Sequence, residues 1–213
     1  MIRTLALCLC LATPVLADFP ETVRGHILPG YAAFADATRA LAGTADTTCD
    51  PDSLRPAYQA AFDAWLGVSH LRFGPVEQGG IGLAIAYWPD PKGSGARAQT
   101  ALLTGDPAAL TPAAFADQSI AARGLFALER LLYPANPTPA DPCALIRATT
   151  TDLARVAGVV NDAWVGGYAD TVRTAGEAGN TPYLSRPEAR QTLFTQVLAA
   201  LEFDLDLRLG RPL

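Results

Sequence analysis

The chain has 213 residues, of which 16 are basic and 21 acidic, so its net charge at pH 7 is −5. This balance argues against nucleic acid as a partner, because proteins that bind phosphate backbones usually present a basic surface. Half of the residues are hydrophobic, and a chain of this length can bury one substantial core.

The first 17 residues have the pattern of a secretory signal peptide. Arg3 supplies a positive start, residues 4–11 are apolar, and residues 15–17 form a small-residue cleavage site. The apolar run is shorter than the roughly 20 residues that a membrane-spanning helix needs. We therefore predict cleavage after Ala17, a mature domain at residues 18–213, a periplasmic location and no transmembrane span.

Two cysteines remain after this cleavage, Cys49 and Cys143, and each lies beside an Asp and a Pro that are typical of helix starts. In an oxidising compartment such a pair is expected to be bridged. The alternative is a pair of metal thiolates, but neither cysteine has another Cys or a His nearby. We predict a Cys49–Cys143 disulfide that joins the starts of two helices.

Helical periodicity dominates the mature chain, and no alternating strand pattern competes with it. Helices are expected at residues 20–43, 52–71, 95–104, 112–133, 141–173 and 187–208. Pro29 should kink the first of them, because it removes a backbone hydrogen bond. Two apolar stripes are expected to lie in the core: Ala121, Leu125, Leu128 and Leu132 in the fourth helix, and Phe194, Leu198, Leu201 and Leu205 in the last.

Residues 72–94 are too rich in Gly and Pro for a continuous helix, and we expect a long ordered loop there. The sequence similarity between residues 63–67 and residues 162–166 suggests a duplicated helical unit. We therefore predict an all-α fold of two packed helical-bundle halves.

Familiar catalytic motifs are absent, and no catalytic residue is predicted. Polar residues instead cluster in apolar or aromatic surroundings. This group comprises His70, Arg72 and Glu77 near the end of the second helix, and Trp88, Asp90 and Lys92 farther along the loop. Solvated loop charges or local ion pairs are the alternative for each, but as a group they indicate a binding cleft, to which we also assign Arg123, Glu129 and Glu202.

Glu129 lies at the edge of the apolar stripe of the fourth helix, where a carboxylate requires a partner. Arg72, Arg123 or a metal can fill that role, and we expect an arginine. Glu202 and Asp206 lie four residues apart on one helix face, which suits either a solvated face or a cation between them. Asp204 and Arg208 have the same spacing and form an expected surface ion pair.

The chain resembles the imelysin-like family of bacterial envelope proteins. The resemblance is carried by Leu-Arg-Phe-Gly-Pro at residues 71–75, Tyr-Trp-Pro-Asp-Pro-Lys at 87–92, residues 124–132 and Leu-Glu at 201–202. The family has a metallopeptidase name and includes the helical domains of some iron-uptake lipoproteins. It implies an all-helical fold of two bundle-like halves with a cleft between them.

The family's best-known motif is Gly-x-His-x-x-Glu, whose Gly and Glu fall on Gly124 and Glu129. Its His position is occupied by Phe126, which cannot coordinate a metal. Glu129 and His70 remain the candidate ligands for a divalent metal or iron. The departure argues against both peptidase activity and tight metal binding at the motif.

Three functions are compatible with these features. The first is a periplasmic binding or accessory protein for metal acquisition, particularly of iron, which takes a small ligand or a metal. The alternatives are a metallopeptidase and a non-catalytic protein that binds an envelope partner. The export signal, the family resemblance and the missing catalytic set favour the first.

Overall fold

A computed structural model describes residues 19–135 and 138–210, and the predicted signal peptide lies outside this part. The described residues contain helices and no strand, which confirms the predicted all-α fold class. The first half of the chain forms α1 (Phe19–Thr22), η1 (Val23–Ile27), α2 (Leu28–Thr47), α3 (Pro51–Leu66), η2 (Gly74–Gly80), α4 (Ile81–Ile85) and α5 (Ser94–Thr104). The second half forms η3 (Pro107–Leu110), α6 (Pro112–Ala116), η4 (Ile120–Ala122), α7 (Gly124–Leu132), α8 (Cys143–Ala163), η5 (Trp164–Tyr168), α9 (Ala169–Arg173), α10 (Arg186–Phe203) and η6 (Asp204–Leu209).

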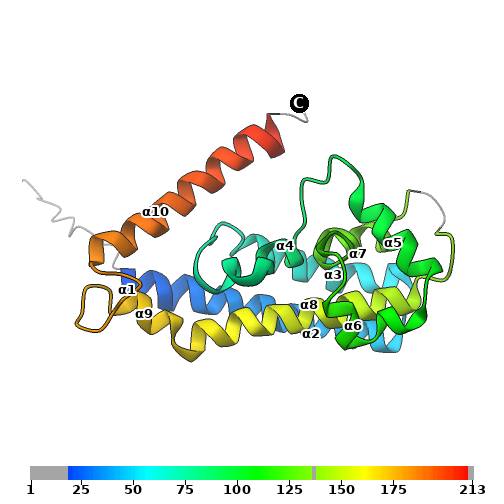
Figure 1. Ribbon diagram of the computed structural model, residues 1–213, viewed down its shortest axis with the longest axis horizontal. Helices are drawn as coiled ribbons and strands as arrows, with labels where there is room; N and C mark the ends of the chain where they lie inside the picture. Colours follow the sequence, from blue (N-terminus) through cyan, green and yellow to red (C-terminus); the bar gives the residue numbers. More distant parts are fainter. Residues whose placement is uncertain (1–18, 136–137, 211–213) are drawn as a thin grey trace, which may run out of the picture.

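The body of the molecule is built around α2, which packs along both α3 and α8 (Figure 1). Helix α2 contributes Tyr31, Phe34 and Leu41 to the core, and all three are fully buried. The two similar segments at residues 63–67 and 162–166 each place a tryptophan in this core. Trp65 contacts Phe34, and Trp164 contacts Tyr31. Burial of each large apolar side chain contributes roughly 1.5–3 kcal/mol, so this shared core is the main support of the fold.

The irregularity predicted at Pro29 takes the form of a π-helical turn, η1, directly before α2. The backbone N–H of Leu28 donates to the carbonyl of Val23, five residues earlier. Proline has no N–H to donate, and insertion of a π turn accommodates the missing bond without ending the helical run. This turn also carries His26 on its exposed side.

The single helix predicted at residues 112–133 is wrong, because the structure divides this segment into α6, η4 and α7. Gly124 begins α7 with φ +77°. A Cβ atom there would lie 2.3 Å from the carbonyl oxygens of Ala84 and Ile85, at the end of α4. Two backbones approach each other so closely here that only glycine fits, and its positive φ interrupts the helix. Hydrophobic periodicity along the sequence does not report such a contact. The apolar stripe from Ala121 to Leu132 is nevertheless buried, as predicted.

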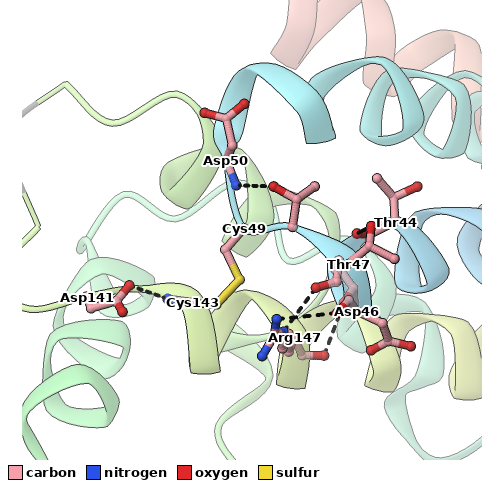
Figure 2. The surroundings of a disulfide bond; sticks show 11 residues. Thr44, Asp46, Thr47, Cys49, Asp50, Asp141, Cys143 and Arg147 are labelled. Carbon is pink, nitrogen blue, oxygen red and sulfur yellow. Dashed lines mark hydrogen bonds between the residues drawn. A yellow bond between two sulfur atoms is a disulfide. The ribbon is translucent and has the colours of Figure 1, made fainter.

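The predicted disulfide between Cys49 and Cys143 is confirmed, with a Cα–Cα distance of 5.3 Å. Figure 2 shows that it joins the segment before α3 to the first turn of α8. Arg147, one turn farther along α8, donates hydrogen bonds to the carbonyl oxygens of Ala45 and Asp46 at 3.0 and 3.3 Å. The bridge and this arginine together hold the end of α2 against the start of α8.

Helix α10 extends away from the body (Figure 1), and Ala189 near its start is the one residue of this helix that is buried. At its other end, Phe203 approaches Trp88. The prediction that its apolar stripe belongs to the core is wrong. Phe194, Leu198, Leu201 and Leu205 are all exposed, with Phe194 at 64%. The periodicity correctly identified an apolar face, but no other described helix lies against it. None of the described helices is long and apolar enough to cross a membrane.

Candidate functional site

The principal cleft has a volume of about 390 Å³ and lies between the end of α3, the η2–α4 region and the end of α10. Three of the nine predicted cleft residues, Arg72, Glu77 and Trp88, line it. The residues 72–94 that were predicted to form a loop are ordered and include the short helices η2 and α4. Residues of this segment, among them Val76, Leu83 and Trp88, contribute to the lining of this cleft.

Aromatic rings form one side of this cleft. Phe126 on α7 lies between Phe62 of α3, at a ring-centroid distance of 5.7 Å, and Trp88, at 6.4 Å. Trp88 in turn contacts Phe203 of α10 edge-on at 5.6 Å. Edge-to-face and offset ring pairs are favourable arrangements, so three helices and the loop between α4 and α5 meet in one continuous aromatic wall. The Phe that replaces the motif histidine is the centre of that wall.

Two arginines supply positive charge to the same cleft. The guanidinium carbons of Arg72 and Arg208 lie 5.2 and 5.3 Å from the centroid of the Phe203 ring. A cation–π contact uses the flat face of a guanidinium group, so N–H donors at its edge can still bind an anion. Arg208 also pairs with Asp204 at 3.0 Å, the i,i+4 pair predicted from the sequence. Glu77 is the acidic residue that faces these groups across the cleft.

The prediction that Glu129 is buried and paired with an arginine is wrong. Its side chain is exposed, and no ion pair includes it within the described ranges. Phe126 lines the cleft, whereas Glu129, three residues farther along α7, is not part of its lining. An exposed carboxylate keeps its hydration and needs no compensating partner.

Arg123 is buried but serves a different ion pair. Its Nε donates to Asp152 of α8 at 2.8 Å, and its Nη1 donates to the carbonyl of Ala116 at 2.6 Å. Asp152 also accepts from Arg155 at 2.6 Å. Arg123 borders a separate cavity of about 220 Å³, so it does not join Arg72 in the principal cleft.

Asp90 and Lys92, at the other end of the segment, lie outside the cleft lining. Asp90 accepts hydrogen bonds from the backbone N–H groups of Ser94 and Gly95 at 2.8 and 2.7 Å, and from the Ser94 hydroxyl at 2.7 Å. These bonds lower its pKa to about 2. Asp90 therefore caps the start of α5, and Lys92 is exposed in the turn before it.

His70 lies beside His26, and their Nε2 atoms are 3.3 Å apart. Partial burial, with a smaller contribution from His26, lowers the pKa of His70. Together with Arg72, His70 borders a second groove of about 630 Å³ between the body and α10. Glu202 is exposed on α10 and lines neither space.

The site residues that sequence reasoning missed are Phe62, Phe203 and Arg208 in the cleft, and His26 beside His70. Phe126 carried a signal as the departure from the family motif, although its role as an aromatic wall was not predicted. No feature of the sequence indicated that Phe203 and Arg208 line the cleft, because their position there depends on where α10 ends relative to Trp88. The exposed pair Asp204–Arg208 was correctly predicted without its position at the cleft.

The chain matches the family model described as Imelysin (Peptidase_M75) over residues 27–213. Among solved structures, it is similar to the crystal structure of an imelysin-like protein from Psychrobacter arcticum 273-4, with a TM-score of 0.76 and 22% sequence identity. This similarity covers 87% of this chain and 59% of that chain, so the present chain spans about three fifths of the solved protein. No curated protein matches it.

Proposed function

The chain belongs to the imelysin family, and from this premise we propose that it is an exported binding protein that supports iron acquisition by taking an anionic, partly aromatic small molecule into the Arg72 cleft. The observation that carries this proposal is the combination of the aromatic wall around Phe126 with the two arginines over Phe203. The Cys49–Cys143 disulfide supports the extracytoplasmic location, because such bonds persist in oxidising compartments.

The chemistry of the cleft suits a ligand with two distinct parts. Aromatic and aliphatic side chains favour an apolar ring, and a few convergent polar groups fix its orientation. Arg72 and Arg208 can bind a carboxylate, sulfonate or catecholate, because each guanidinium offers several N–H donors in a planar fork. Anionic aromatic chelators of iron fall within this class. The resemblance to iron-uptake lipoprotein domains is what links the proposal to iron.

The residues at the motif positions do not fit a catalytic metal centre. Phe126 cannot ligate, Glu129 is exposed outside the cleft, and the described residues contain no group of three or more His, Cys, Asp or Glu side chains arranged to hold an ion. A peptidase of the metal-dependent class needs both metal ligands and a base beside them. The family's peptidase name therefore lacks support in this cleft.

The test uses 8-anilinonaphthalene-1-sulfonate, a fluorescent aromatic anion, as the probe. Saturable binding with one probe per cleft is expected. Arg72→Met keeps the side-chain length and removes the charge, so it should weaken binding by about 10- to 100-fold, as expected for one lost charged hydrogen bond of about 1.5–3 kcal/mol. Leu198→Ser, on the exposed face of α10, is the matched control, because it removes apolar surface outside the cleft.

Ferric 2,3-dihydroxybenzoate should displace the probe from wild-type protein. It should not displace the probe that still binds weakly to the Arg72→Met variant. The same probe affinity in wild type and Arg72→Met would contradict the proposed cleft. The link to iron is tested separately by measuring expression of the protein in iron-starved cells. Unchanged expression would remove iron acquisition from the proposal and leave the anion-binding cleft to be judged on the probe alone.

A further inference from the structure

The two histidines of the chain, His26 and His70, meet at the surface although 44 residues separate them in sequence. His26 projects from the π-helical turn η1, and His70 lies in the turn after α3. Their Nε2 atoms are 3.3 Å apart, their ring centroids are 5.2 Å apart, and their ring planes differ by 23°. The Nε2 atoms of the two rings are therefore close enough to contact a single ion.

These distances match two imidazoles that share one tetrahedral metal ion. With metal–nitrogen bonds of about 2.05 Å and a tetrahedral angle, the two nitrogens should be about 3.3 Å apart. Adding about 1.15 Å from each nitrogen to its ring centre places the centroids about 5.2 Å apart in the same geometry. In a linear N–H···N bond of 3.3 Å the centroids would be about 5.6 Å apart instead. The observed centroid distance of 5.2 Å agrees with the shared-ion geometry and is shorter than that of the linear hydrogen bond.

We propose that His26 and His70 form a binding site for a divalent late transition metal ion, with Cu²⁺ and Zn²⁺ as the preferred occupants. Imidazole nitrogen suits these ions, and affinity along the first-row series is highest for Cu²⁺. Neither histidine lines the Arg72 cleft, although His70 and Arg72 both border the groove that adjoins it. The inference does not depend on the proposed ligand of the cleft.

The surroundings leave room for further ligands. His26 is exposed, and His70 borders the groove between the body and α10, which is also lined by Gln196 and Asp204. No third His, Cys, Asp or Glu in the described part of the chain completes a cluster with the pair. The remaining coordination positions would therefore hold water or an exogenous ligand, as in metal sites that stay open on one side.

Proton competition at this site is modest. Without metal, either Nε2 can donate to the other, depending on the tautomers of the two rings. Metal binding at both Nε2 atoms needs both rings neutral with the proton on Nδ1, which a neutral imidazole reaches by tautomerisation. The π turn that carries His26 matters because it sets the direction of this side chain toward His70.

The experiment uses tag-free mature protein, in which both imidazole signals of the NMR spectrum belong to this pair. Zn²⁺ is titrated while the Cε1–H resonances are followed, and Cu²⁺ binding is measured by calorimetry and electron paramagnetic resonance. One ion per chain is expected, the two His resonances should shift together, and the Cu²⁺ spectrum should show imidazole nitrogen coupling. His26→Gln and His70→Gln should each weaken binding by at least about tenfold.

Glu202→Gln is the matched control, because it neutralises an exposed acid outside this groove, and its affinity should equal that of wild type. Circular dichroism of each metal-free variant checks its fold, and His26→Gln decides the test if the half-buried His70 proves necessary for folding. A shift of only one His resonance, or a His26→Gln affinity within twofold of wild type, overturns the proposal.

Discussion

The buried ion pair between Arg123 and Asp152 should be one of the most sensitive points of the fold. The two side chains are only 8% and 4% exposed, and their closest atoms are 2.8 Å apart. Asp152→Ala would leave the Arg123 guanidinium buried with a single remaining hydrogen bond, to the carbonyl of Ala116. Removal of one partner from a buried pair destabilises by about 3–5 kcal/mol, mainly because the other charge is left uncompensated.

The measurement is urea unfolding followed by circular dichroism, with the disulfide intact. For a chain of this size the predicted loss corresponds to a fall in Tm of about 6–20 °C. Asp170→Ala is the matched control, because Asp170 also pairs with an arginine, Arg173, but these side chains are 65% and 39% exposed. An exposed pair contributes about 0–1 kcal/mol, so the control should unfold almost as wild type does.

A second variant separates the charge argument from simple loss of packing. The combined replacement Arg123→Met with Asp152→Leu removes both charges while retaining apolar volume, and it should recover most of the stability that Asp152→Ala loses. The reasoning is refuted if Asp152→Ala and Asp170→Ala destabilise equally. It is also refuted if the double variant is no more stable than Asp152→Ala.

Two further predictions concern Gly124 and Asp90. Gly124→Ala should destabilise the fold by at least about 2 kcal/mol in urea unfolding, because φ is +77° and the new Cβ would meet the carbonyls of Ala84 and Ile85. The control is Gly158→Ala in α8, which has open space around its Cβ and should be neutral or stabilising. Equal effects of the two substitutions would contradict this reasoning. The pKa of Asp90 is lowered from 3.8 to about 2 by hydrogen bonds at the start of α5, so its cap stabilises the fold above about pH 4 and this contribution is lost as the pH falls through 2. The difference in Tm between wild type and Asp90→Ala should accordingly shrink between pH 4 and 2, and a difference independent of pH would show that the carboxylate charge does not act there.

Local sequence was sufficient to predict the helical class, the buried face of the fourth helix and the disulfide, but not every helix boundary. The spacing of Leu125, Leu128 and Leu132 predicted a buried helix face, and that face is buried. Cys49 and Cys143 were identified by their number and by the helix starts beside them, and the bond joins those starts. The break at Gly124 was not predicted, because it arises from contact with a backbone some 40 residues earlier in the chain.

The site was predicted only in part, for the same reason. Arg72, Glu77 and Trp88 belong to one short segment, and their clustering along the chain carried over into the cleft. Glu129 was expected to be buried because it follows an apolar stripe, yet periodicity assigns a residue to the edge of a face without saying whether a neighbour covers that edge. The structure leaves Glu129 in solvent, and no desolvation has to be compensated there.

By itself the sequence determined that the chain is helical, which faces of its helices are apolar, and which two cysteines are joined, because these properties follow from spacing along the chain. Only the tertiary structure decided that Phe126 contacts Trp88 and that His26 contacts His70. The same holds for the Phe203 ring, which both Arg72 and Arg208 contact. Each of these contacts joins helices whose relative placement results from the packing of the whole core, and that placement has no local signature.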